Sequence, residues 1–169
     1  MRLDFVHLLL AYFLIHRASA WVFPPFGNRP NDIWTSVAMS KTVTEIKTSN
    51  APAPVGPYSQ AVLVGSTLYC SGQIALNPAT GEFVGEGDVQ EEARQVLKNL
   101  NAVLSEAGAS AKNVVRCTVY LADLNDFAKV NEIYSEFFKD NLVAPSRSCV
   151  QAGALPKGAL VEIDCIAEQ

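Results

Sequence analysis

With 169 residues, of which 49% are hydrophobic, the chain is long enough to bury one core, and a single domain is expected. Three of the 13 basic and two of the 17 acidic residues lie in the first 38 positions, so the remainder is acidic, with ten basic and fifteen acidic residues. An acidic surface repels phosphate backbones, which argues against binding of nucleic acids.

Both histidines, His7 and His16, lie in the first twenty residues. If this segment is removed, the mature chain has no histidine, which excludes Ser-His-Asp and Cys-His nucleophile systems and histidine-ligated metals. Acid–base chemistry would then be carried out by Glu, Asp, Tyr, Lys, Cys or water. The cysteines form no CxxC pair, so neither a zinc site nor a disulfide framework is expected, and each is predicted to be a small buried strand residue. They are Cys70, Cys117, Cys149 and Cys165.

The first twenty residues have the organisation of a signal peptide. Arg2 precedes a short apolar run at residues 8–15, and Ala18-Ser19-Ala20 forms a small-residue cleavage site. Because the run is too short to span a bilayer as a permanent helix, the mature form is not expected to be held in a membrane.

Residues 21–40 are predicted to be an unstructured extension, since they show no hydrophobic periodicity and contain three prolines. The small-residue cleavage site followed directly by Trp21 resembles the bipartite presequences of algae with complex, red-lineage plastids. This resemblance implies delivery to the plastid, with residues 21–40 acting as a transit peptide and residues 41–169 forming the mature domain. The alternatives are a plain secretory signal, which four unpaired cysteines disfavour, and a cytosolic form started at Met39.

Short strands open the domain. Residues 51–57 contain three prolines, which remove ladder donors, so they are expected to form an extended surface loop that ends at Tyr58. Gly65-Ser66 then predicts a hairpin with a type II′ turn, because glycine stands first. The expected strands of this part are residues 42–46, 61–64 and 67–71.

Two amphipathic helices follow. Apolar residues recur at spacings of three and four over residues 89–107, with Asp88 as the N-cap and Gly108 as the stop signal. A second apolar stripe covers residues 127–138. The remaining strands are expected at residues 114–121, 146–151 and 159–167. This order predicts an α+β fold, with a mostly antiparallel sheet and two helices on one face.

The last two predicted strands each carry a charge among apolar or small residues, Arg147 and Glu162. Because side chains alternate along a strand, Arg147 shares a face with Cys149, and Glu162 points away from the apolar side of its own strand. With helices on one sheet face, both charges are expected on the uncovered face. That face also carries Leu160 and Ile166, so it is expected to be buried in an oligomer, with both charges at or near a subunit boundary.

From the residues alone, Arg147 has two alternative roles. Its planar guanidinium fits a carboxylate, so it either pairs with a structural acid or binds an anionic ligand. Glu162 could be the structural partner or a second residue of the same site.

Five motifs that follow Met39 carry a resemblance to a known family. They are Gly56-Pro57-Tyr58-Ser59-Gln60-Ala61, Ser71-Gly72-Gln73-Ile74, Asn125-Asp126-Phe127-Ala128-Lys129-Val130-Asn131, Arg147-Ser148-Cys149-Val150 and Ala154-Leu155-Pro156-Lys157-Gly158-Ala159-Leu160-Val161-Glu162-Ile163. In this order they resemble the Rid family (RidA/YjgF), the reactive intermediate deaminases. The resemblance implies a chorismate-mutase-like α+β fold and a homotrimer with sites in the clefts between subunits. It also implies hydrolysis of 2-imino acids such as 2-iminobutanoate and 2-iminopropanoate, for which no cofactor is needed.

By the same resemblance, Arg147 would clamp the substrate carboxylate, and Glu162 would activate the attacking water. The residues implied to line the pocket are Tyr58, Ser71, Gly72, Asn131 and Cys149, the last through its backbone. The Cys149 thiol is not expected to act as a nucleophile, and the full pocket is expected to include Tyr58 or Asn131 from a neighbouring subunit. Ser146 departs from the family's usual Pro-Ala-Arg sequence, which leaves fine substrate preference open.

Two other functions remain as alternatives. Ribonuclease activity or translation inhibition has been ascribed to members of this family, but the acidic domain has no basic stripe with interleaved aromatics. A small-metabolite-binding regulator without catalysis could use the same cleft.

Overall fold

The computed structural model describes residues 42–169, and the predicted signal and transit segments lie outside the described residues. The strands are β1 Val43–Ile46, β2 Ala61–Val64, β3 Thr67–Gln73, β4 Val114–Leu121, β5 Ser146–Gln151 and β6 Val161–Glu168. The helices are α2 Val89–Glu106 and α3 Phe127–Phe137, and three short 3₁₀ turns precede β4, α3 and β6.

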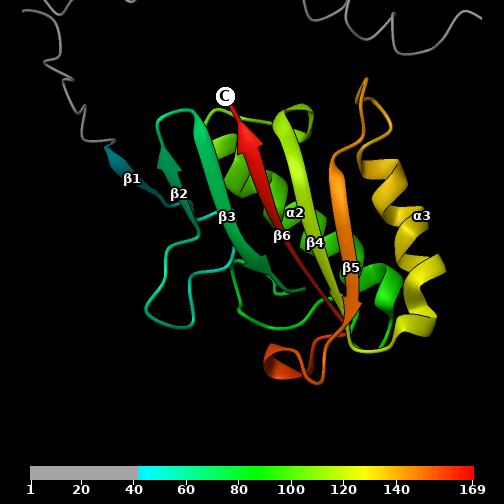
Figure 1. The fold of residues 1–169 in the computed structure, drawn as a ribbon. Helices are drawn as coiled ribbons and strands as arrows, with labels where there is room; N and C mark the ends of the chain where they lie inside the picture. The colour runs from blue at the N-terminus through cyan, green and yellow to red at the C-terminus, as the bar shows by residue number, and fades with distance from the viewer. Residues whose placement is uncertain (1–41) are drawn as a thin grey trace, which may run out of the picture. The chain divides into compact units, whose positions relative to one another are not determined.

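The six strands form one sheet in the order β1-β2-β3-β6-β4-β5. All neighbouring strands are antiparallel except β4 and β5, which run parallel. Figure 1 shows α2 crossing behind the sheet and α3 lying beside β5. The predicted α+β architecture, a mostly antiparallel sheet with two helices, is therefore confirmed.

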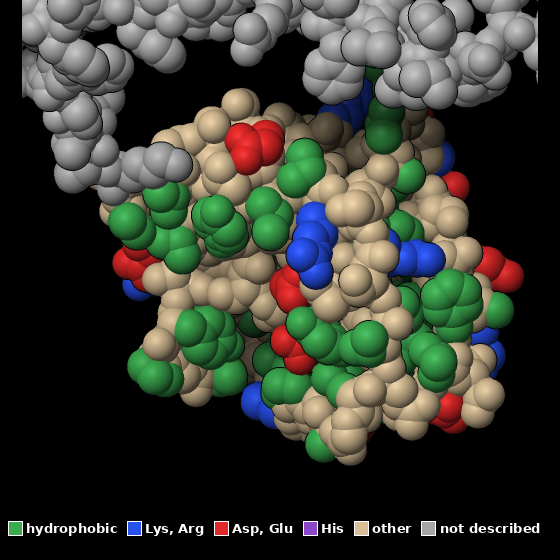
Figure 2. All heavy atoms as spheres, viewed as in Figure 1, with side chains coloured by type: hydrophobic (Ala, Val, Ile, Leu, Met, Phe, Trp, Pro, Cys, Tyr) green, Lys and Arg blue, Asp and Glu red, His purple; other side chains and the backbone are tan. Residues whose placement is uncertain are grey.

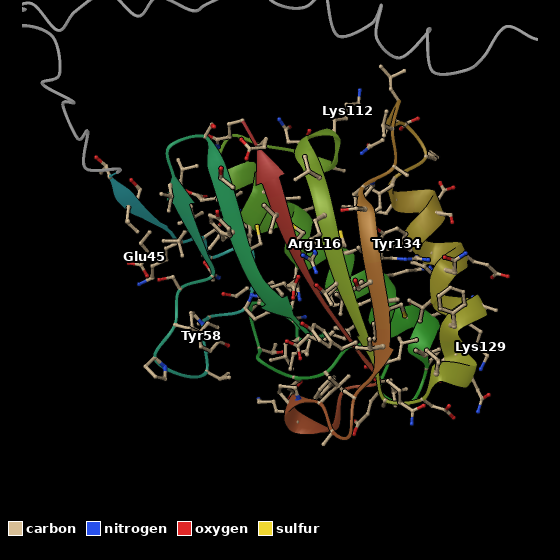
Figure 3. The ribbon with its side chains drawn as sticks, viewed as in Figure 1. Glu45, Tyr58, Lys112, Arg116, Lys129 and Tyr134 are labelled. Carbon is tan, nitrogen blue, oxygen red and sulfur yellow. The ribbon has the colours of Figure 1, made fainter. Side chains whose placement is uncertain are left out.

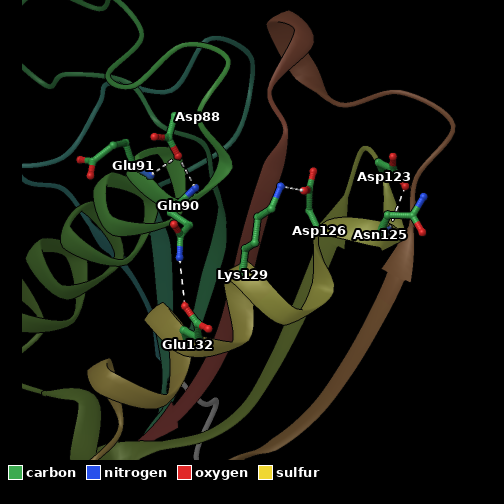
Figure 4. Close-up of polar contacts among 8 residues, drawn as sticks. All are labelled: Asp88, Gln90, Glu91, Asp123, Asn125, Asp126, Lys129 and Glu132. Atoms are coloured by element: carbon green, nitrogen blue, oxygen red, sulfur yellow. Dashed lines mark hydrogen bonds and ion pairs between the residues drawn. The ribbon is translucent and has the colours of Figure 1, made fainter.

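The local signals for turns and helix ends act as expected. Gly65 has a φ of 65°, which suits the first position of the predicted hairpin turn. The Asp88 side chain accepts from the backbone N–H groups of Gln90 and Glu91 and so caps α2 (Figure 4). Between the helices, the Gln90 amide donates to the Glu132 carboxylate over 3.1 Å, which links the start of α2 to α3.

The core lies between the sheet and α2. Leu100 and Leu104 on α2 are fully buried, and so is Ile163 on β6. Full burial of one such side chain is worth about 1.5–3 kcal/mol relative to exposure. The predicted apolar face of residues 89–107 therefore supplies much of the packing that holds the sheet and α2 together.

Three buried polar side chains of α2 bind backbone next to the sheet. Glu92, only 2% exposed, accepts from the Leu160 N–H over 2.8 Å and holds the chain as it enters β6. Asn99 donates to the carbonyls of Ile74 and Leu76, and Gln95 donates to Asn99. These contacts anchor both the segment after β3 and the start of β6 to the same helix.

A row of cysteines crosses the helix-covered face of the sheet. Cys70 pairs with Cys165, Cys165 pairs with Cys117, and Cys117 pairs with Arg147 at the edge strand β5. All four cysteines are free thiols, and all but the half-buried Cys149 are buried. The predicted burial is found for Cys70, Cys117 and Cys165, whereas Cys149 on the edge strand is only partly covered.

Figure 2 shows the opposite sheet face, where apolar side chains lie beside basic and acidic ones. Tyr69 and Val150 on this open face remain 48% and 45% exposed. Across the described residues, no helix is long and apolar enough to cross a membrane.

Candidate active site

Four of the predicted site residues, Tyr58, Ser71, Gly72 and Glu162, line one pocket of about 360 Å³. We call these four residues the glutamate half-site. The end of β3 and the start of β6 form the base of the pocket, and the proline-rich loop before β2 forms a wall. The half-site thus joins a loop to two neighbouring strands of the sheet.

Gly72 makes room for the Glu162 carboxylate. A Cβ atom at position 72 would overlap Oε1 of Glu162 and would lie 2.8 Å from its Cδ. The strand pairing of β3 with β6 is irregular between Cys70 and Gln73, which places the glycine backbone close to this side chain. Glycine at position 72 is therefore required for the observed position of the carboxylate.

The environment of Glu162 favours its protonated form. Partial burial raises the pKa of the Glu162 carboxyl, and the nearby negative charge of Asp164 raises it further. Asp164 lies on the same strand face and accepts a hydrogen bond from the Tyr120 hydroxyl over 3.2 Å. A carboxyl with a raised pKa can exchange protons closer to neutral pH, as acid–base catalysis requires.

Two hydroxyl groups of the glutamate half-site are oriented by backbone. Ser71 Oγ donates to the Ser59 carbonyl over 2.6 Å, so its lone pairs remain available to accept from a ligand. The Tyr58 hydroxyl accepts from the Val55 N–H over 3.3 Å, which leaves its proton available to donate. The pocket therefore offers one acceptor and one donor beside the carboxylate.

Three further predicted residues, Asn131, Arg147 and Cys149, lie together at the other end of the sheet. We call them the arginine half-site. Arg147 Nη1 donates to Asn131 Oδ1 over 2.8 Å, which joins β5 to α3. The Arg147 side chain is exposed, and among the described residues it forms no ion pair. The interpretation of Arg147 as the partner of a structural acid is therefore not supported within this part of the chain.

The prediction that Arg147 lies on the uncovered sheet face is wrong. Its neighbour in register is Cys117, whose side chain is in the core, so Arg147 points to the helix-covered side and reaches α3. Glu162 pairs with Tyr120, and both occupy the open face as predicted. Side chains do alternate along residues 146–151, as the sequence predicts. Five of these six residues are exposed, however, so no buried residue indicates which side of the strand faces the core.

The two half-sites do not meet within one chain. Figure 3 places Tyr58 in the loop on one side of the sheet and Tyr134 at α3 on the other. The Arg147 guanidinium lies over the Tyr134 ring. The pocket around Glu162 contains none of the three residues of the arginine half-site. A single ligand that contacts both Arg147 and Glu162 therefore requires a second copy of the chain.

The Cys149 thiol is a weak candidate for a nucleophile. Burial raises its pKa, and the positive charge of Arg147 only partly counters that effect. A protonated thiol is a poor nucleophile, which agrees with the expectation from the sequence. Within the described residues, no group of three or more metal-binding side chains occurs.

Sequence reasoning missed three residues that shape the half-sites. Gln60 is 2% exposed and hydrogen-bonds to the backbone of Thr48, Ala51 and Pro52, so it holds the loop that walls the pocket. Phe127 and Tyr134 place their rings against the Arg147 guanidinium. Their spacing from Asn131, four residues before and three after, was a signal for one helix face.

The family described as Endoribonuclease L-PSP matches residues 48–169. The chain belongs to this family. The Rid (RidA/YjgF) family resemblance drawn from the five motifs is thereby confirmed.

Other members of the Rid family are closely similar to the chain. A RutC family protein of Synechocystis is 56% identical over 126 residues, which cover 75% of this chain and 96% of the relative. The human 2-iminobutanoate/2-iminopropanoate deaminase is 52% identical over 124 residues, which cover 73% of this chain and 88% of the relative. In the crystal structure of Escherichia coli TdcF with bound serine, the protein is 44% identical, with a TM-score of 0.71, over 75% of this chain and 98% of that one.

Proposed function

We propose that this Rid family member hydrolyses 2-imino acids, such as 2-iminobutanoate and 2-iminopropanoate, to 2-oxo acids and ammonia. One observation carries the proposal: an arginine without an acidic partner among the described residues and a glutamate of raised pKa occupy two incomplete half-sites. The name of the human relative and the serine bound to TdcF support a small substrate of the amino-acid type.

The substrate has two features that the half-sites can recognise. Its carboxylate matches the planar fork of donors on Arg147, which is free to bind in bidentate fashion. Its imine carbon and nitrogen need a water molecule and protons, which Glu162 can handle. The lone pairs of Ser71 can accept a hydrogen bond from the substrate nitrogen, and the backbone at Cys149 can accept another.

The reaction needs only orientation and proton transfer. In the first step, Glu162 as carboxylate takes a proton from water as the water oxygen bonds to the imine carbon, and it passes this proton to the imine nitrogen, which gives a carbinolamine. In the second step, Glu162 takes the proton of the new hydroxyl group and donates it to the amino nitrogen, the C–N bond breaks, and ammonia leaves as the 2-oxo acid forms. Since an imine is already electrophilic, no cofactor is required for this sequence.

The active unit that we propose is a homotrimer with sites between subunits. Arg147 and Glu162 lie on opposite faces of the sheet, so a site that uses both takes one half from each of two chains. The open face also exposes Tyr69 and Val150, which a neighbouring copy would cover. A ring of three chains then forms three equivalent sites.

Coupled turnover tests the reaction. A dehydratase generates 2-iminobutanoate from threonine, and the formation of 2-oxobutanoate is followed with and without the protein. We expect acceleration by the wild type and near-complete loss in Arg147→Ala, while Arg147→Lys, which keeps the charge but loses the fork, recovers only part of the rate. Equal activity of the wild type and Arg147→Ala would refute the clamp.

Subunit mixing tests the location of the site. Glu162→Gln and Arg147→Ala are co-expressed in equal amounts with different affinity tags, and mixed oligomers are isolated. In every mixed trimer, one of the three sites pairs an intact glutamate half with an intact arginine half, so about a third of wild-type activity should return. If verified mixed oligomers recover no activity, Arg147 and Glu162 do not form a site across a subunit boundary.

An RNA-directed activity is the competing proposal, because the matched family is described as an endoribonuclease. The acidic balance of the domain disfavours a phosphate backbone, and the pocket around Glu162 is lined by no lysine or arginine. A metabolite-binding regulator would bind 2-oxo acids without turnover. Incubation with labelled RNA and the imine assay on the same preparation distinguish these three functions.

We also propose delivery to a complex plastid, through a signal peptide at residues 1–20 and a transit peptide at residues 21–40. The support is the order of charged residue, apolar run, small-residue site and Trp21 in the sequence. The family match begins only at residue 48. Fusion of residues 1–40 to a fluorescent protein tests the proposal, and fluorescence in the medium or cytosol instead of the plastid would contradict it.

A further inference from the structure

One face of α3 surrounds the Arg147 guanidinium with neutral groups. The guanidinium carbon lies 4.5 Å from the centre of the Tyr134 ring and 5.4 Å from that of Phe127, and the Asn131 amide oxygen accepts its Nη1 proton. These three residues occur at positions i, i+4 and i+7, so they share one side of the helix. The guanidinium is therefore contacted by two ring faces and one amide, and none of these groups carries a negative charge.

The absence of an acid from this set has a chemical consequence. A carboxylate beside Arg147 would occupy the fork of donors and would cancel the charge that a ligand must find. An aromatic face attracts the cation through its quadrupole but leaves the edge of the guanidinium, with its N–H groups, open. Such a site orients an arginine while keeping it available for an anion.

We propose that Tyr134 and Phe127 are positioning residues, which hold the Arg147 guanidinium by stacking so that its free edge binds the carboxylate of the ligand. The inference rests on the proposed function for the identity of the ligand, a 2-imino or 2-oxo acid, and adds the residues that determine its affinity. Tyr134 contributes more than Phe127, because its ring is closer and is 6% exposed, against 40% for Phe127.

The hydroxyl of Tyr134 is not needed for this role. It is buried beside the Cys117 thiol and makes no hydrogen bond of normal geometry with any described residue. Burial raises the pKa of the Tyr134 phenol, so the group stays neutral and adds no charge near Arg147. The ring, and not the hydroxyl, is thus the functional part of the side chain. Two substitutions at this position should therefore have different effects. Tyr134→Leu removes the π face, whereas Tyr134→Phe keeps it.

Phe138 supplies a matched control. Its ring centre lies 4.7 Å from that of Tyr134, and it is equally buried, at 5% exposure. Among residues 42–169, only Phe127 and Tyr134 have rings over the Arg147 guanidinium. Phe138→Leu therefore creates a comparable defect in the same cluster and keeps both stacked rings.

The experiment uses the purified full chain and two readouts that do not depend on turnover. The first is the NMR signal of Arg147 Nε–Hε, assigned through its loss in Arg147→Lys. The stacked rings should shift this proton upfield, and Tyr134→Leu should move it toward the value of a free arginine. The second is the dissociation constant of 2-oxobutanoate, which Tyr134→Leu should raise on the order of tenfold and Phe127→Leu by a smaller factor.

We expect Tyr134→Phe to restore both the shifted signal and the affinity that Tyr134→Leu loses, and Phe138→Leu to leave both in place. The imine assay on the same variants should show a higher KM for Tyr134→Leu, with a smaller change in kcat. Equal weakening by Tyr134→Leu and Phe138→Leu, or an Arg147 signal that Tyr134→Leu does not move, would overturn the inference. If Tyr134→Leu does not fold, Phe127→Leu and Tyr134→Phe decide through the same readouts. Binding of 2-oxobutanoate through Arg147 without imine turnover would contradict the proposed function while leaving the positioning role intact.

Discussion

The two half-sites hold opposite charges by different means. Glu162 lies against backbone, over a glycine, in a pocket formed by two central strands and a loop. Arg147 lies on an edge strand, is exposed, and is held by side chains of a helix. The carboxylate is thus constrained by close packing and the guanidinium by stacking, so the two should respond differently to substitution.

The largest effect is expected at the proton-transfer group. Glu162→Gln keeps the size of the side chain and removes its titratable oxygen, so kcat should fall by about 10²–10⁴ with little change in KM. Arg147→Ala should instead act on KM as well, because it removes a binding contact. Steady-state kinetics of the coupled assay separate the two parameters. A Glu162→Gln variant with normal kcat would assign proton transfer to ordered water or another side chain.

Gly72→Ala tests the packing beneath the carboxylate. The new methyl group would displace the flexible end of Glu162, which has room to move, so the protein should remain folded while activity falls on the order of 10- to 100-fold. Gly153→Ala is the matched control, since its Cβ would meet nothing within 4 Å. Thermal melts and kcat measured together give the result, and a normal kcat in Gly72→Ala would show that the exact position of Glu162 is unimportant.

Gln60→Leu tests the support of the pocket wall. The substitution leaves the N–H of Thr48 and three backbone carbonyls without their buried partner, so the free energy of unfolding should fall by about 3 kcal/mol. Gln73 is also buried, but its side-chain amide donates a single hydrogen bond within the described residues, to the Ser71 carbonyl over 3.2 Å, so Gln73→Leu should cost less. Urea denaturation measures both values. Equal losses would mean that the loop is held by other contacts.

The smallest effect is a shift in pH dependence. Glu162 must be ionised to take a proton from water, and its raised pKa places the acid limb of kcat/KM above the ordinary value of 4.5. Asp164→Asn removes a neighbouring negative charge, so the limb should move to lower pH by roughly half a unit. Asp140→Asn removes the same charge elsewhere and should not move it. A shift to higher pH in Asp164→Asn would exclude Glu162 as the titrating group.

Several features of the fold could be predicted because their causes are local. The spacing of apolar residues over 89–107 determines the buried face of α2, and Asp88 can cap only the helix that follows it. Gly65 at the start of a two-residue turn similarly selects the hairpin. The site residues Glu162 and Arg147 were found from their unusual place in strands and from the family motifs around them.

The sequence by itself thus determined the order of elements, the family, and which residues form the candidate site. Only the tertiary structure decided that Arg147 faces α3 while Glu162 faces the open side of the sheet. The reason is that the face each residue occupies depends on which strand its own strand pairs with, and in which direction. The parallel pairing of β5 with β4 has no local signal in six residues that are mostly exposed. For Glu162 the outcome was predictable, since four buried residues alternate with it along β6 and hold that strand's orientation.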